Sequence, residues 1–106
     1  MDNDYNAPIL SEIIDVIIQE TTISLNDDSQ YVEFVFDNLG TETILIKIKD
    51  KLTETIKTIK LISNASIGFK QLNVSSIKVL TTSGTSKLFY CFQGYLKTIV
   101  LGEGVS

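Results

Sequence analysis

The fold is decided by residues 31–49, which read YVEFVFDNLGTETILIKIK. On each side of a short break every second residue is apolar: Val32, Phe34, Phe36, Ile44, Ile46 and Ile48. Because successive side chains of a strand point to opposite faces, this alternation predicts two β-strands with one apolar face each. The break from Asp37 to Gly40 suits a type I turn, so we expect a β-hairpin with Gly40 at positive φ. Each apolar face needs a covering layer, and the sequence therefore predicts a β fold.

Composition sets the class of the chain. Its 106 residues suit one domain with a core of its own. Hydrophobic residues make up 43% and charged residues 21%, as in globular proteins rather than disordered or membrane ones. No apolar run approaches the roughly 20 residues that span a bilayer, and the acidic start MDNDYNAPIL is unlike a secretory signal. We therefore expect a chain that begins at Met1 and has no membrane partner.

Missing residue types disfavour several kinds of chemistry. The chain has no His and no Trp, has a single Cys, and its nine basic residues are all Lys. Without His there is no Ser-His triad and the commonest zinc ligand is missing, so we expect neither enzymatic activity nor a cofactor. Without Arg, and with net charge -4, nucleic-acid binding is disfavoured. Cys91 lies in the apolar run 88–92, where a buried structural thiol is expected.

Charge segregates along the chain. Residues 1–45 contain ten acids and no Lys, whereas residues 46–106 contain nine Lys and three acids. The split predicts that one half faces the other, within a subunit or between subunits. Solvated faces whose charge happens to segregate are an equally good interpretation.

Further strands are predicted around the opening stretch. They cover residues 20–25, 56–62, 67–70, 77–81, 87–93 and 95–101, with a second hairpin loop at 82–86 and a bulge or bend at Gly94. With turn signals roughly every 8 to 12 residues, this pattern predicts an all-β fold, a single antiparallel β-sandwich of about seven or eight short strands, Ig-like or jelly-roll-like. The strand 87–93 is apolar on both faces, so it is either central or covered by a second subunit. The expected core residues are Phe34, Phe36, Ile44, Ile46, Phe69, Ile77, Val79 and Phe92.

The N-terminal segment is the expected contact with a partner. We predict an arm over residues 1–19, a sandwich domain over 20–102 and a frayed tail over 103–106. Apolar residues between 9 and 18 fit a helix by their spacing and a strand by their alternation, and a lone small domain has little room to cover both sides of such a segment. A terminal strand or helix packed wholly within its own sandwich is the alternative. The expected partner-interface residues are Ile9, Leu10, Ile13, Ile14, Ile17 and Ile18.

Two ligand classes have weak support in the sequence. Hard oxygen ligands for calcium are available in two loops, from Asp27, Asp28, Asp37 and Asn38. The spacing of an EF-hand is absent and turn formation explains all four residues, so we predict no metal site. Sugar binding by a β-sandwich usually needs exposed aromatic rings, above all Trp, and the tyrosines of this chain are expected to pack instead.

Several short segments between Tyr31 and Tyr95 are typical of one group of proteins. They are FDNLGT at 36–41 with the Ile/Lys strand after it, IKV at 77–79, SGT at 83–85 and GY at 94–95. In these segments the chain resembles small β-sandwich virion structural proteins of tailed bacteriophages, which decorate capsids or build head fibres and appendages.

This resemblance implies a role in assembly. It implies a non-enzymatic structural protein that forms a homo-oligomer, such as a trimer, and contacts another virion protein in a virion assembled in the host cytoplasm. It carries over no functional residues. The alternative is a monomeric adhesin-like or carbohydrate-binding β-sandwich module.

Overall fold

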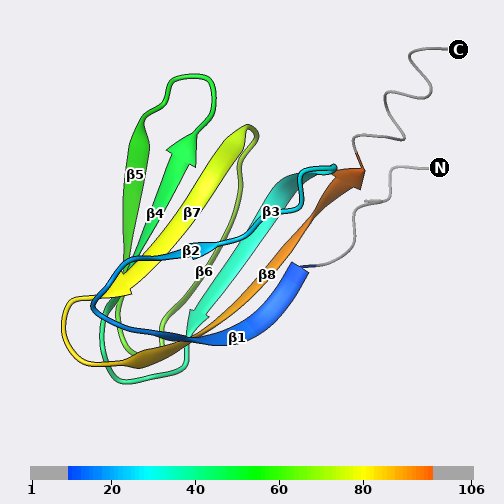
Figure 1. Cartoon of the computed structure of the whole chain (residues 1–106). Helices are drawn as coiled ribbons and strands as arrows, with labels where there is room; N and C mark the ends of the chain where they lie inside the picture. The colour runs from blue at the N-terminus through cyan, green and yellow to red at the C-terminus, as the bar shows by residue number, and fades with distance from the viewer. Residues whose placement is uncertain (1–9, 97–106) are drawn as a thin grey trace, which may run out of the picture.

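The computed structural model describes residues 10–96, which form eight β-strands and no helix (Figure 1). Within this range there is accordingly no helix that could cross a membrane. The strands are β1 (Leu10–Val16), β2 (Thr21–Ile23), β3 (Ser29–Asn38), β4 (Ile44–Asp50), β5 (Ile56–Leu61), β6 (Ser66–Lys70), β7 (Val74–Thr81) and β8 (Ser86–Leu96).

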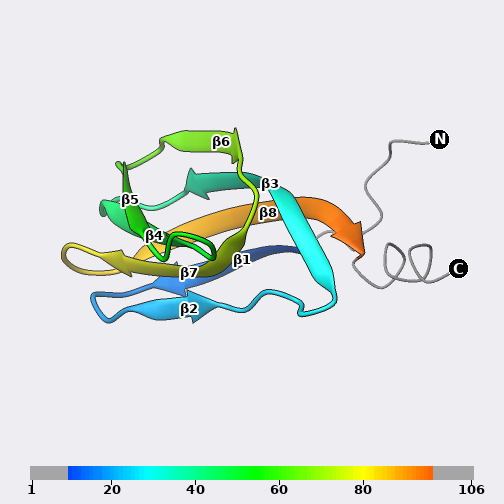
Figure 2. The same ribbon diagram turned by 90° about the horizontal axis from the view of Figure 1, so that it is seen from above.

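The strands form two four-stranded antiparallel sheets packed face to face (Figures 1 and 2). Sheet A has the order β1-β8-β3-β6 and sheet B the order β2-β7-β4-β5. The pairs β1–β8, β2–β7, β3–β6 and β4–β5 are nested, so each strand of the first half lies beside one from the second half. This nesting is the jelly-roll arrangement, and the predicted antiparallel β-sandwich is confirmed.

The predicted central hairpin is wrong, although both of its strands exist. Strand β3 pairs with β6 and β8, whereas β4 pairs with β5 and β7 in the other sheet. A hairpin would have placed the apolar faces of β3 and β4 side by side on one sheet. In opposite sheets the two faces meet across the core and cover each other. The loop 82–86 likewise joins β7 of sheet B to β8 of sheet A and is not a hairpin loop.

The conformation expected of Gly40 is also corrected. Gly84 is the glycine with positive φ among the described residues. At Gly40 the constraint is space, because a Cβ there would overlap the Ser86 hydroxyl and lie 2.8 Å from the backbone nitrogen of Lys87. Glycine is needed where the β3–β4 connection passes against the start of β8.

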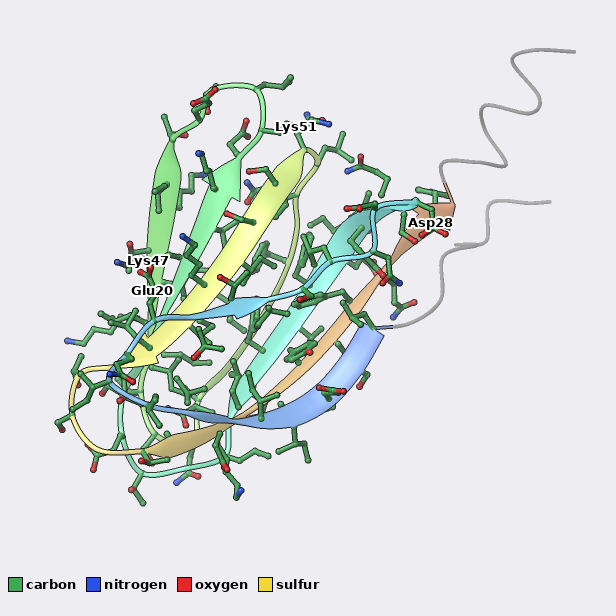
Figure 3. The ribbon with its side chains drawn as sticks, viewed as in Figure 1. Glu20, Asp28, Lys47 and Lys51 are labelled. Carbon is green, nitrogen blue, oxygen red and sulfur yellow. The ribbon has the colours of Figure 1, made fainter. Side chains whose placement is uncertain are left out.

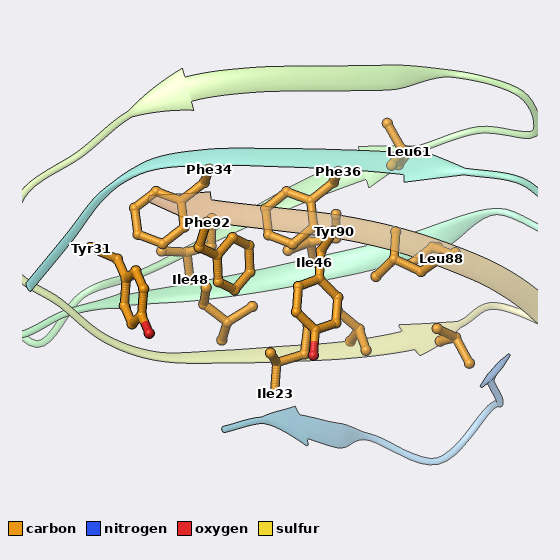
Figure 4. Packing of buried hydrophobic residues seen from close by; sticks show 14 residues of the cluster. Ile23, Tyr31, Phe34, Phe36, Ile46, Ile48, Leu61, Leu88, Tyr90 and Phe92 are labelled. Carbon is orange, nitrogen blue, oxygen red and sulfur yellow. The ribbon is translucent and has the colours of Figure 1, made fainter. Parts of the chain in front are cut away.

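The core lies between the sheets and, within residues 10–96, combines five aromatic rings with nine aliphatic side chains (Figure 4). The Phe92 ring lies 5.0 Å from Phe34, 5.4 Å from Phe36 and 4.9 Å from Tyr90, centroid to centroid. Of the eight predicted core residues, seven are buried. Phe69 is only half-buried, because β6 is the edge strand of sheet A and lacks a neighbour on one side.

A register irregularity occurs opposite Gly94, but the extra residue is Val32 of β3, and the expected separate strands 87–93 and 95–101 are replaced by one strand, β8, that runs through Gly94. The pairing of β3 with β8 shifts register between Tyr31 and Glu33, and Gly94 is the residue opposite Tyr31. A Cβ at Gly94 would overlap the carbonyl oxygen of Gln30 and lie 2.6 Å from the Cα of Tyr31. Glycine therefore permits the close approach of the two backbones at this irregularity.

Strand β1 settles the choice between helix and strand for the N-terminal segment. Residues 10–16 pair with β8 along seven residue pairs, and Val16 is fully buried in the core. The described part of the expected arm is thus joined to sheet A of its own chain. Residues 1–9, including Ile9, and the expected tail 103–106 lie outside the described residues.

Candidate functional site

The predicted partner-interface residues divide into two groups. Leu10 and Ile14 point inward and pack against the core. Ile13 is 59% exposed, and Ile17 and Ile18, in the connection from β1 to β2, are 41% and 57% exposed. Of the predicted interface residues that the structure describes, Ile13, Ile17 and Ile18 are therefore the ones open to a partner.

The outer face of sheet A carries an apolar band that continues from Ile13. Strand pairing places Ile13 directly opposite Phe89, and Val35 directly opposite Cys91. Phe89 and Cys91 are half-buried and lie two residues apart on β8, so the four side chains are neighbours on one face. We call these four residues the sheet A band. Val35 is 40% exposed, and no other strand of residues 10–96 lies over this face.

The band accounts for a strand that is apolar on both sides. Leu88, Tyr90 and Phe92 of β8 point into the core, while Phe89 and Cys91 point outward. The strand is central in its sheet, lying between β1 and β3. Its outer side chains nevertheless remain partly open to solvent. Cys91 is half-buried rather than fully buried, which corrects the expectation for this thiol.

The outer face of sheet B has a different character. Lys47 lies directly opposite Lys78, Lys49 is two residues further along β4, and Lys60 is opposite Leu45. We call Lys47, Lys49, Lys60 and Lys78 the sheet B lysines. The excess of Lys in the second half of the chain is visible in the sequence. The grouping of these four lysines on one face is not, because strand pairing brings together residues that are distant in sequence.

Ion pairs connect the acidic and basic halves of the chain. Glu20 contacts Lys47 at 2.8 Å and Lys78 at 3.9 Å, Asp15 contacts Lys87 at 2.7 Å, and Glu33 contacts Lys70 at 3.6 Å. Every one of these pairs joins an acid from residues 1–45 to a lysine from residues 46–106. The predicted facing of the two halves thus occurs within the subunit. These pairs are on the surface, so each contributes little to stability.

The four residues considered for calcium are not brought together. Asp27 and Asp28 precede β3, whereas Asp37 and Asn38 end it, about 30 Å away for a strand of this length. The Asn38 side chain is fully buried and hydrogen-bonded within the protein. Across residues 10–96 no cluster of three or more metal-ligating side chains occurs.

Two of the three tyrosines in residues 10–96 pack in the core as expected, whereas Tyr95 is 37% exposed. Tyr31 and Tyr90 are buried, and Tyr31 meets Phe92 edge-on at 6.2 Å between ring centroids. Burial, together with Glu12, raises the pKa of the Tyr90 hydroxyl. These two rings are therefore not free to stack on a sugar.

The fold is shared with a solved structure of a bacterial appendage protein. No family model and no curated protein matches the sequence. The solved structure belongs to work describing Bacillus endospore appendages as a family of disulfide-linked pili. It matches with a TM-score of 0.57 over 91% of this chain and 97% of that chain, at 16% identity. At this identity the likeness shows the fold, and it does not single out the tailed-phage proteins that the sequence resembles.

Proposed function

We propose that this chain is a non-enzymatic structural subunit that assembles with copies of itself. The observation that carries the proposal is the sheet A band, an apolar strip across β1, β8 and β3 with no other strand of the described chain over it. Apolar side chains gathered on a sheet face are typical of a surface that is covered in an assembly. Ile17 and Ile18 are further exposed apolar residues just after the end of β1.

The setting of this assembly is a particle or a surface appendage. The phage-like segments of the sequence support a virion component, a capsid-decoration, head-fibre or appendage protein that also contacts another virion protein. The fold shared with an endospore appendage pilus protein supports an appendage-type role. Both settings require the same property, which is specific association between copies of the chain.

The cysteine content bears on how copies are held together. A continuous chain of disulfide-linked subunits needs at least two cysteines in each subunit, and these 106 residues contain only Cys91. One cysteine per subunit can link subunits only in pairs. Assembly beyond a pair therefore does not depend on disulfides between these residues in this proposal, and it should persist in a reducing agent.

Light scattering over a range of concentrations tests the proposal. The wild-type chain should form oligomers, and Ile13→Asp or Val35→Asp should shift it towards the monomer, because a charge in the sheet A band opposes its burial. Leu52→Asp is the matched control, since Leu52 is 74% exposed but lies in the β4–β5 turn away from the band. Circular dichroism should show that all three variants stay folded.

Two results would overturn this function. A wild-type chain that is monomeric at every concentration would exclude self-assembly. Oligomers that survive both substitutions in the sheet A band, in variants shown to be folded, would place the contact elsewhere and remove the observation on which the proposal rests.

A further inference from the structure

The outer face of sheet B combines positive charge with hydroxyl groups. Besides the sheet B lysines, the pairing of β2, β7, β4 and β5 places hydroxyl side chains on the same face. They are Thr22 opposite Lys78, Thr58 opposite Lys47 and Ser76 opposite Lys49. The chain as a whole has net charge -4, so this positive face is a local exception.

Glu20 shows which chemical group this face holds. Lys47 and Lys78 are directly opposite each other, an arrangement that is unfavourable for like charges. The carboxylate of Glu20 reaches over from the β1–β2 connection and contacts both lysines, as Figure 3 shows for Glu20 and Lys47. The protein thus supplies one carboxylate to a site that would otherwise contain two facing cations.

The remaining lysines of the face lack such a group. Within residues 10–96, neither Lys49 nor Lys60 is paired with a carboxylate. A hollow of about 320 Å³ lies on the face, and Lys49, Ser76 and the apolar Ile56 line it together with Glu20, Lys47 and Lys78. Lys49 and Lys60 thus place positive charge on either side of the contact of Glu20 with Lys47 and Lys78.

The geometry favours a long ligand over a small ion. Neighbouring strands lie about 4.8 Å apart and side chains two residues apart on one strand about 7 Å apart, so the lysines form a spaced array on an open sheet. Each Lys is a single point charge without the forked donors of Arg, which suits separate carboxylates along a chain. The hydroxyl groups of Thr22, Thr58 and Ser76, each beside a lysine, suit a ligand that is itself rich in hydroxyls.

We propose that the outer face of sheet B binds an acidic polysaccharide. Carboxylates spaced along the polymer contact the sheet B lysines, and its hydroxyls contact Thr22, Thr58 and Ser76. Glu20 competes with the polymer for Lys47 and Lys78. This activity is separate from self-assembly, because it uses the other sheet of the sandwich.

Polygalacturonate, a linear polysaccharide with one carboxylate per sugar, is the probe, and dextran is the neutral control polymer. Binding to the full chain is measured by biolayer interferometry at low salt and again at high salt. Wild type should bind polygalacturonate but not dextran, and the affinity should fall as salt rises. Lys47→Met or Lys78→Met should weaken binding by about tenfold, and Glu20→Gln should strengthen it several-fold.

Matched controls lie on the other sheet. Asp15 pairs with Lys87 as Glu20 pairs with Lys47, but on the outer face of sheet A. Asp15→Asn and Lys87→Met should therefore leave polygalacturonate binding unchanged. Ile13→Asp, which tests self-assembly, should also retain binding to immobilised polymer, so a failure of the proposed assembly can be told apart from a failure of this site.

Several outcomes would overturn the inference. Absence of binding at low salt, or equal loss in the Lys47 and Lys87 variants, would remove sheet B as the site. Weaker binding by Glu20→Gln would show that Glu20 supports the ligand rather than competes with it. Equal affinity for inorganic polyphosphate would make the face a general anion surface and exclude selectivity for a polysaccharide.

Discussion

The side-chain oxygen of Asn38 accepts a hydrogen bond of 2.7 Å from the hydroxyl of Ser86, which joins the end of β3 to the start of β8. Asn38 is fully buried, and its amide nitrogen donates to the carbonyl oxygens of Glu42, at 2.8 Å, and Leu61, at 2.9 Å. The same oxygen also accepts from the backbone nitrogen of Gly40 at 3.1 Å. One side chain therefore fixes four segments at the end of the sandwich where β3 finishes.

Replacing the Asn38 side chain should lower the free energy of unfolding by much more than an average substitution does. Asn38→Leu leaves the Ser86 hydroxyl and two carbonyl oxygens without their partner in a buried site. We expect a loss of about 3 kcal/mol or more in the free energy of unfolding, measured by urea denaturation. Asn26→Ala, at an exposed loop position, should change it by less than about 0.5 kcal/mol. A similar small change for Asn38→Leu would show that the buried hydrogen bonds are readily replaced.

A substitution at Gly40 tests the close approach of the β3–β4 connection to the start of β8. Gly40→Val should destabilise by more than about 1 kcal/mol, because its Cβ would overlap Ser86 and crowd the backbone of Lys87. Gly68→Ala is the control, since the nearest atom to a Cβ there, on Val35, lies at an ordinary 3.6 Å. Thermal denaturation followed by circular dichroism measures both. Equal melting temperatures for wild type and Gly40→Val would contradict the steric account.

Adjacent residues of β3 test which face is inward. Phe34 is fully buried, stacks on Phe69 and meets Phe92 at a tilt of 59°, whereas Val35 is 40% exposed on the outer face. Phe34→Ala should lower the free energy of unfolding by about 3 to 5 kcal/mol, and Val35→Ala should lower it by less than about 1 kcal/mol. The reverse ranking would mean that the strand is out of register by one residue.

Glu20 should make stability depend on pH. The hydrogen bond from Lys47 lowers the pKa of the Glu20 carboxyl, so on acidification the unfolded chain binds this proton before the folded protein does. The stabilisation is complete above the ordinary pKa of 4.5 and is lost as pH falls through the lower folded value. The melting temperature of Glu20→Gln should therefore lie below that of wild type at pH 7, with the gap closing as pH falls below 4.5 and through the lowered pKa of the folded protein.

Alternation in the sequence was enough to predict most of the strands and most of the core, although it left residues 9–18 open between helix and strand. Phe34, Phe36, Ile44 and Ile46 alternate with more polar residues, and each inward position follows from that local pattern. The pattern does not say which strand is the neighbour. Strands β3 and β4 look like a hairpin because they are adjacent in sequence, but their apolar faces cover each other only from opposite sheets.

Candidate surfaces depend on pairing and were therefore predicted only in part. Ile13, Ile17 and Ile18 could be found because they lie in one segment. The meeting of Val35 with Cys91, and of Lys47 with Lys78, joins residues that are 56 and 31 positions apart. No local signal in the sequence reports such contacts between strands.

Truncation tests whether the N-terminal segment belongs to the sandwich or to a separable arm. Removing residues 1–18 deletes β1, leaves β8 without a neighbour along seven residue pairs and removes the buried Val16 with the packed Leu10 and Ile14. Each such side chain contributes about 1.5 to 3 kcal/mol when fully buried, against a typical total stability of about 5 to 15 kcal/mol. We expect this truncation to abolish the cooperative thermal transition, whereas removal of residues 1–9 should preserve it. A folded, soluble 19–106 fragment that has lost only self-association would contradict this and show that β1 acts as an attachment arm.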